Sequence, residues 1–242
     1  MKKILFILIC LPFLAQAQIQ TTGLVENKSD TIITKDPMDP GREYWVIHNM
    51  KGNISFQGFM RNGKREGVWR EYRDFNGILY KLSEFKDNML DGAVLTFTTT
   101  GPIESDETYL KGKKNGLRMT YTYFGGKFKL IENYKNDTLH GLRQSFYDDG
   151  KLQEEGNYIN GKRDGVTKWY LQTGTLSMEY NYKLGDLEGP AKQFDEKGRI
   201  KQEGVYRNNN EEGEWKEYKD SVLTKKIIYK QGQILKEVPV KK

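Results

Sequence analysis

Apolar and polar residues alternate along most of this chain, in short stretches that end at glycine, asparagine or aspartate. Val166-Thr-Lys-Trp-Tyr170 and Glu179-Tyr-Asn-Tyr182 show the alternation, and the chain of 242 residues has only six prolines to interrupt it. An alternation with period two predicts a β-strand whose side chains point to opposite faces in turn. No segment keeps a helical period, so the sequence predicts strands joined by tight turns.

The stretches recur as seven tandem copies of one unit, with anchor glycines 24 or 25 residues apart. An aromatic residue stands five positions after each anchor. A fixed period of this kind is the signature of a repeat architecture. The anchors are Gly67, Gly92, Gly116, Gly141, Gly165, Gly189 and Gly213. The aromatic residues are Tyr72, Phe97, Tyr121, Phe146, Tyr170, Phe194 and Tyr218.

Two turn positions divide each unit into a β-hairpin. Four residues before the anchor every copy has Gly, Asn or Asp, the residues that tolerate a left-handed backbone. These are Gly63, Asn88, Gly112, Asp137, Gly161, Gly185 and Asn209. A second turn glycine, such as Gly150 or Gly174, follows the anchor in six copies. Short hairpin loops need such residues because their backbone has a positive φ.

Tandem hairpins predict an all-β fold, an elongated single-layer antiparallel sheet that is twisted and curled. We expect the array over residues 44–235, with seven full copies and a half-copy at each end. Residues 18–43 would form an N-terminal linker or cap, and residues 236–242 a charged tail. The aromatic columns would line the inside of the curl. Gly165→Val should cost about 1–3 kcal/mol and a substitution at Thr167 under about 0.5 kcal/mol.

The N-terminus resembles a cleavable signal peptide over residues 1–17. Lys2 and Lys3 precede the apolar run from Ile4 to Leu14, and an Ala-x-Ala site ends at Ala17. The chain's single cysteine, Cys10, lies in this segment, so the mature protein would have no disulfide. We therefore expect export to the periplasm or the extracellular space, without a transmembrane anchor.

Charge and residue usage narrow the function classes. Lys and Arg number 39 against 33 Asp and Glu, and removal of Lys2 and Lys3 leaves 37 against 33, an excess of four. This mild, mixed excess argues against nucleic-acid binding. Without cysteine and with only His48 and His140, catalytic triads and His/Cys zinc sites lack their residues. We expect no enzyme, no cofactor and no metal site.

One pattern suggests a binding surface. Lys168, Lys192 and Lys216 stand three residues after their anchors, on the face of Tyr170, Phe194 and Tyr218. They predict a basic, aromatic-lined row for an acidic or glycan-like partner, about 10 Å between rungs. Alternatively, the lysine stems only cover ring edges. If the row binds, reversing all three lysines to glutamate should abolish capture and leave the melting temperature nearly unchanged. Trp69 and Trp215, expected to be exposed on the opposite side, are the second choice.

The unit itself resembles a known repeat. Asn62-Gly63-Lys64-Arg65-Glu66-Gly67-Val68-Trp69 and Asn160-Gly161-Lys162-Arg163-Asp164-Gly165 are similar to the MORN repeat, in its bacterial variant class, over residues of about 56 to 232. Two positions after the anchor, where many MORN units have glycine, this chain varies. The residues there are Trp69, Val94, Arg118, Arg143, Thr167, Ala191 and Trp215.

These features give two hypotheses for the function. The first is an exported binding or scaffold module that holds an unknown protein or cell-envelope component. The second comes from the resemblance, because proteins with this variant repeat are often described as antitoxin components of toxin–antitoxin systems. An exported chain would suit immunity against a toxin met outside the cytoplasm. Neither hypothesis fixes the partner or the oligomeric state.

Overall fold

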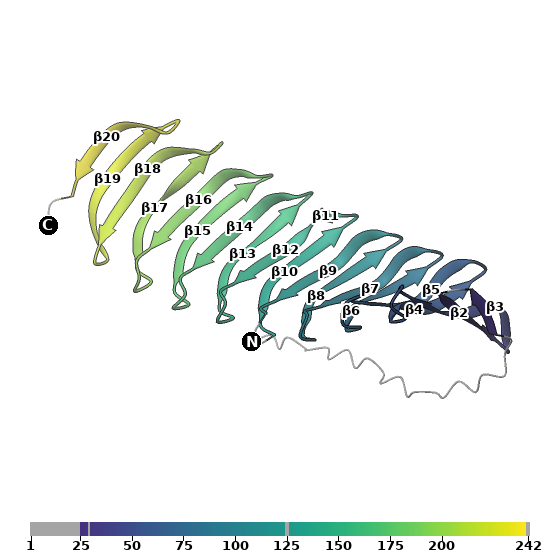
Figure 1. The fold of residues 1–242 in the computed structure, drawn as a ribbon. Coiled ribbons are helices and arrows are strands. Elements are labelled where there is room, and N and C mark those ends of the chain that lie inside the picture. The colour runs from purple at the N-terminus through teal and green to yellow at the C-terminus, as the bar shows by residue number, and fades with distance from the viewer. Residues whose placement is uncertain (1–24, 29, 124–125, 241–242) are drawn as a thin grey trace.

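The computed structural model describes residues 25–28, 30–123 and 126–240, and they form twenty strand segments (Figure 1). The first ten are β1 (Val25–Lys28), β2 (Thr31–Asp36), β3 (Asp39–His48), β4 (Ile54–Arg61), β5 (Lys64–Tyr72), β6 (Leu79–Lys86), β7 (Met89–Phe97), β8 (Ile103–Leu110), β9 (Lys113–Tyr121) and β10 (Phe128–Lys135). The others are β11 (Thr138–Leu139), β12 (Gly141–Phe146), β13 (Leu152–Ile159), β14 (Lys162–Tyr170), β15 (Leu176–Lys183), β16 (Asp186–Phe194), β17 (Ile200–Arg207), β18 (Asn210–Lys219), β19 (Val222–Lys230) and β20 (Gln233–Pro239).

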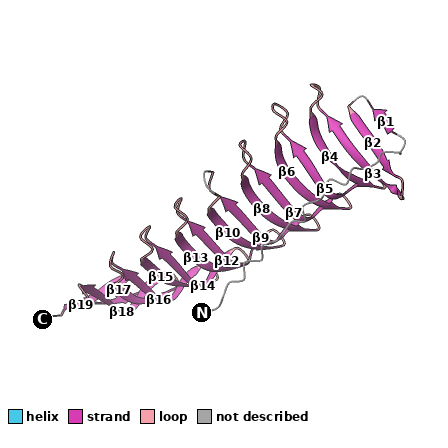
Figure 2. Cartoon of the chain, turned by 90° about the horizontal axis from the view of Figure 1, so that it is seen from below, coloured by secondary structure: helices cyan, strands magenta, loops and turns pink. Residues whose placement is uncertain are grey.

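The strands form one open antiparallel sheet in which neighbours in sequence are neighbours in space. For example, β14 pairs with β13 on one side and with β15 on the other. Segments β11 and β12 are two parts of one strand that is interrupted at His140, and both pair with β10. The sheet is a single layer, with β1 and β20 at its two ends (Figures 1 and 2). The predicted all-β fold of tandem hairpins is confirmed.

The sheet extends beyond the expected array at both ends. Strands β1 and β2 lie within residues 18–43, where a linker or cap was expected, and they continue the sheet as two further strands. Strand β20 includes residues 236–239 of the expected tail. The predicted signal segment, residues 1–17, lies outside the described residues.

Backbone angles confirm the turn column. All seven of its residues have positive φ, from 64° at Asp137 to 101° at Gly185. The preceding residue is also left-handed in each case, as with Asn160 at 50°, so these are two-residue turns that fit the sheet's twist. Anchor Gly165 has a φ of 89° inside a strand. A Cβ there would meet no atom within 4 Å, so a side chain at this position would be strained by the backbone alone.

The buried column differs from the expected one. Trp69 and Trp215 are 5% and 2% exposed, and Thr167 is completely buried. The expectation of exposed tryptophans was therefore wrong. The low cost expected for a substitution at Thr167 stays a prediction, although this side chain is buried. We name the side of the sheet that carries these residues the tryptophan face. Over the last repeats it holds a continuous chain of rings: Tyr182, Trp169, Tyr180, Tyr206, Trp215 and Tyr229, with neighbouring centroids 5.0–6.4 Å apart.

Candidate functional site

The three lysines of the predicted row lie on β14, β16 and β18, on the face opposite to Trp215. We name it the lysine face. The lysines alternate with three glutamates of the intervening strands: Lys168 pairs with Glu155 and Glu179, Lys192 with Glu179 and Glu203, and Lys216 with Glu203. Lys168 Nζ is 3.7 Å from Glu179 Oε2, and Lys216 Nζ is 4.0 Å from Glu203 Oε1. From Glu155 to Lys216 the row is therefore a zipper of alternating sign and is not purely basic. The binding of a partner by the three lysines stays a prediction.

The aromatic residues beside the row belong to the same zipper. The hydroxyls of Tyr170 and Tyr218 donate hydrogen bonds of 2.8 Å to Glu155 and Glu203. Burial, followed by these hydrogen bonds, raises the pKa of both tyrosines to about 12. Phe194 has the same position in its repeat but no hydroxyl to donate. The structure thus brings all six predicted residues together on one face, where Lys168 and Lys216 lie within 4.0 Å of glutamates and both tyrosine hydroxyls donate to glutamates.

Over repeats two to four, most positions of the lysine face that carry paired charges in later repeats hold apolar side chains. In the row that continues the zipper, Met119 of β9 pairs with Ile131 of β10, and Leu95 of β7 pairs with Asp106 of β8. Leu117 and Leu142, one row away, are 44% and 40% exposed. We name this region the apolar patch. It comprises Leu95, Leu117, Met119, Ile131 and Leu142 with the rings of Tyr121, Phe128 and Phe146.

Three of these rings form one edge of the apolar patch. The centroid of Phe128 is 5.4 Å from that of Tyr121 and 6.1 Å from that of Phe146. Asp106 is the acidic residue of the row here, paired with both Leu95 and Met119. Burial, and then the charge of Glu107, raises the pKa of Asp106 above its ordinary value. This stretch is the part of the lysine face where apolar side chains lie open to solvent without a zipper of charges over them.

On the tryptophan face, the same repeats contain an ionic ladder instead of rings. Arg118 Nε donates to Glu107 Oε1 at 2.8 Å, and Arg118 Nη1 donates to Glu132 Oε2 at 2.9 Å. Arg143 Nε continues the ladder to Glu132 Oε1 at 3.3 Å. The hydroxyls of Tyr109 and Tyr134 donate to the carboxylates of Glu107 and Glu132. Although burial opposes it, these donors hold the pKa of Glu107 below its usual value.

The two faces therefore exchange character along the sheet. Over repeats five to seven, rings pack on the tryptophan face and charges pair on the lysine face. Over repeats three and four, charges pair on the tryptophan face and apolar side chains occupy the lysine face. Sequence reasoning missed this exchange. Its signal was the change from Leu95 and Met119 to Lys168 and Lys192 in one column, together with the change from Arg118 and Arg143 to Ala191 and Trp215 in another.

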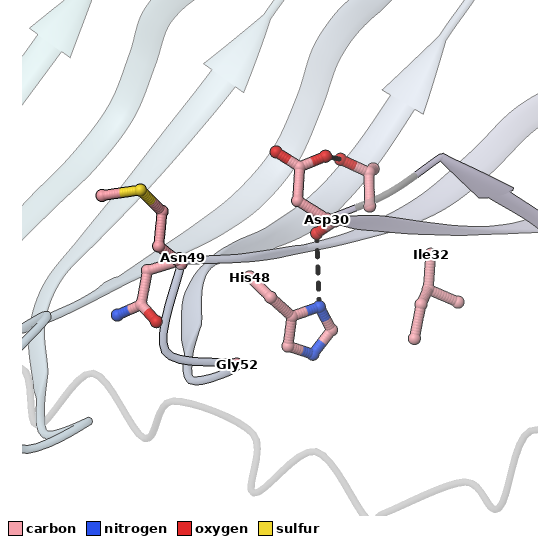
Figure 3. Close-up of a pocket in the computed structure, with 7 residues that line it drawn as sticks. Asp30, Ile32, His48, Asn49 and Gly52 are labelled. Atoms are coloured by element: carbon pink, nitrogen blue, oxygen red, sulfur yellow. Dashed lines mark hydrogen bonds between the residues drawn. The ribbon is translucent and has the colours of Figure 1, made fainter.

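The two histidines lie at the end of strand β3 and at the break between β11 and β12. His48 lines a hollow with Asp30, Ile32, Asn49 and Gly52, and its Nδ1 lies 3.3 Å from the backbone oxygen of Asp30 (Figure 3). The backbone N–H of His140 donates to Asn133 O at 2.8 Å where β11 and β12 separate. Within the described residues no three His, Cys, Asp or Glu side chains converge as metal ligands. No helix of the described chain is long and apolar enough to cross a membrane.

Comparison with known proteins identifies a repeat family over part of the chain. A family model described as MORN repeat variant matches residues 139–160, 163–184 and 187–208, three consecutive hairpins. A search of curated proteins gives no match. Among solved structures, a porin-like protein from Bacteroides uniformis is 10% identical, with 78% of this chain and 91% of that chain covered and a TM-score of 0.19. The matching hairpins are those that carry Lys168 and Lys192, and such repeats indicate a repeat-based binding module.

Proposed function

We propose that the chain is an exported, non-catalytic scaffold module that binds a protein of the cell envelope through the apolar patch. The observation that carries the proposal is that Leu117 and Leu142, which are 44% and 40% exposed, lie on the same face as the three neighbouring rings of Tyr121, Phe128 and Phe146. Exposed contiguous apolar surface on a soluble protein usually marks an interaction site.

The geometry of the sheet supports a protein partner over a small substrate. The residues of the patch lie on strands β7 to β12 of a single-layer sheet, and successive strands lie about 4.8 Å apart. It is therefore an extended, open surface, whereas small molecules bind mostly in concave sites that bury most of their area. Aromatic residues and methionine, as in Tyr121, Phe128, Phe146 and Met119, are enriched where protein interfaces are fully buried.

Asp106 constrains the partner chemically. A partner that covers the patch removes this carboxyl further from water, which is unfavourable unless the partner places a hydrogen-bond donor or a cation against it. The partner surface that fits is thus apolar with a lysine, arginine or hydroxyl near its centre. The zipper of repeats five to seven, in which lysines and glutamates alternate, contributes little net charge and would keep that half of the face in water.

Site-specific photocrosslinking tests this function in the native cell. A benzophenone amino acid at Leu117 or Leu142 should give one discrete adduct with an envelope protein, because these side chains lie in the patch. The same amino acid at Val205, which is 42% exposed on the zipper half of the lysine face, is the matched control. Equal adducts from all three positions, or adducts from Val205 alone, would overturn the proposal.

A further inference from the structure

The tryptophan face carries a second candidate binding site, in addition to the apolar patch on the opposite face. Two hollows, of about 510 and about 440 Å³, adjoin one another over strands β8, β9 and β10 and share Glu104, Tyr121 and Lys129 in their linings. We name the combined feature the hydroxyl hollow. Each volume lies within the range of small-molecule sites, roughly 300–1,000 Å³.

The floor of the hollow exists because small hydroxyl side chains replace large ones. Thr96, Ser105 and Thr120 pair with one another in a row across β7, β8 and β9. In later repeats the position of Thr96 and Thr120, four residues after the anchor, is filled by Trp169, Gln193 and Glu217. The hydroxyls of Thr96 and Ser105 are 2.7 Å apart and hydrogen-bonded. The small residues leave the backbone recessed beneath a polar floor.

The rim carries charges that the described structure does not pair. Glu104 and Lys129 are the extra residues of the bulges in β8 and β10, so they face each other across β9, about 10 Å apart. Asp148 completes the rim. Among the described residues none of these three has an ion pair, in contrast to the ladder beside them. The buried hydroxyl of Thr122, which also lines the hollow, has no hydrogen-bond partner within the described chain.

This set of groups selects one class of ligand. An anion would meet Glu104 and Asp148, a cation would meet Lys129, and an apolar molecule would leave the buried hydroxyl of Thr122 without a partner. A polyhydroxylated ring can donate to the two carboxylates and accept from the ammonium. Its hydroxyls can also donate hydrogen bonds to the threonine and serine hydroxyls and accept hydrogen bonds from them, because a hydroxyl is both a donor and an acceptor. We propose that the hydroxyl hollow binds a saccharide.

Apart from Tyr121, whose ring lies at the edge of both sites, the hollow and the apolar patch are lined by different residues. Arg118 also lines the hollow, but its guanidinium already donates hydrogen bonds to Glu107 and Glu132. The ligand would therefore be recognised by the hydroxyls of the floor and the charged residues of the rim. The two faces of one thin sheet would then hold a saccharide on one side and a protein on the other. Substitutions away from Tyr121 that abolish one binding activity would leave the other in place.

Titration calorimetry with defined sugars tests the inference. The probes are a soluble tetramer of β-1,4-linked N-acetylglucosamine, glycan strands released from peptidoglycan, and oligomers of mannose and galactose. The mature chain should bind at least one of them. Thr120→Val removes one floor hydroxyl at nearly constant size and should weaken binding several-fold, and Lys129→Met should weaken it about tenfold. Lys201→Met is the matched control, because Lys201 is the extra residue of the equivalent bulge in β17 and lies outside the hollow.

Two results would overturn the inference: binding of none of these sugars at millimolar concentration, or equal binding by Lys129→Met and Lys201→Met. The double variant Leu117→Asp/Leu142→Asp, which is directed at the apolar patch, should bind sugar as the unaltered chain does. This variant separates failure of the saccharide site from failure of the proposed protein-binding function. Thermal unfolding of each variant shows that the fold is retained.

Discussion

Trp215 of β18 lies over Gly204 of β17, so closely that a methyl group at Gly204 would come within 2.1 Å of the indole Cδ2 atom. The ring is fixed there by a hydrogen bond from its Nε1 to Val205 O, at 3.2 Å. Trp69 and Gly58 make the same pair at the other end of the array, where the distance would be 2.6 Å. Each tryptophan is thus buried on a sheet of one layer because its neighbour has no side chain.

Gly204→Ala should destabilise the protein by about 2–3 kcal/mol, because the indole must move out of its packed position. In a Trp215→Ala background, which itself costs about 3–5 kcal/mol, the same substitution should cost under about 0.5 kcal/mol. Urea unfolding of the two single variants and the double variant measures this coupling. Lys201→Ala, an exposed substitution on the same strand, is the control. Additive effects would show that the two residues are not in contact.

Thr167→Val should be neutral or should stabilise the fold by up to about 1 kcal/mol. The Oγ1 atom of Thr167 is buried and has no hydrogen-bond partner among the described residues, so a methyl group in its place removes an unfavourable buried polar atom. Thr167→Asp should cost about 3 kcal/mol or more, because it buries a carboxyl without a partner. Chemical denaturation of both variants provides the measurement, and a tolerant Thr167→Asp would contradict the burial.

The triple reversal Lys168→Glu/Lys192→Glu/Lys216→Glu should now lower the melting temperature, in contrast to the expectation from sequence. With Glu155, Glu179 and Glu203 between them, the new residues would make one line of six carboxylates on adjacent strands. Each opposing pair of like charges costs roughly 0.2–1 kcal/mol. Thermal scans at low and high salt should show part of the loss regained with salt. An unchanged melting temperature at low salt would count against the zipper.

Arg118→Met should destabilise the protein by about 2 kcal/mol at pH 7, because Glu107 and Glu132 lose a charged donor. In the unaltered chain the pKa of Glu107 is depressed, so its contribution is present above the ordinary glutamate value of 4.5 and is lost as the pH falls through the folded-state pKa. The difference between the two proteins should therefore shrink toward pH 3. Unfolding curves of both proteins between pH 7 and pH 3 measure this difference in the free energy of unfolding. A difference that does not change with pH would show that the ladder charges are not coupled to folding.

The turns and the hairpin unit were predictable because they depend on local backbone sterics. Asn88, Asp137 and Gly161 differ in chemistry but share the ability to adopt a positive φ, and this restriction is visible in a single column of the sequence. Lys168 and Tyr170 were also placed correctly on one face, since side chains alternate along a strand.

Two features could not be predicted from one position of the repeat at a time: which side chains are buried, and whether the charges of the lysine row are offset. Both are decided by the residue that lies opposite on the neighbouring strand. The column that contains Trp69, Arg118 and Ala191 looks variable. Its partners across the sheet, Gly58, Glu107 and Tyr180, vary in compensation, so that a large ring meets glycine and a cation meets a carboxylate. Such pairs can be identified only from the strand register, which a β-bulge shifts within hairpins such as β4–β5 and β13–β14.

Paired surface substitutions test most directly whether the apolar patch of repeats two to four is the surface that holds the partner. Leu117→Asp/Leu142→Asp places two charges in the patch, whereas Val205→Asp/Val222→Asp places two at similarly exposed sites outside it, 42% and 48% exposed. Both double variants should melt close to the unaltered chain, since exposed substitutions usually change stability by no more than about 0.5 kcal/mol each.

The measurement is the amount of the partner, identified from the photocrosslinked adduct, that each variant captures. The patch variant should capture at least about tenfold less than the unaltered chain, which corresponds to roughly 1.4 kcal/mol of binding energy. The control variant should capture a normal amount. Normal capture by Leu117→Asp/Leu142→Asp, with the fold intact, would contradict the account.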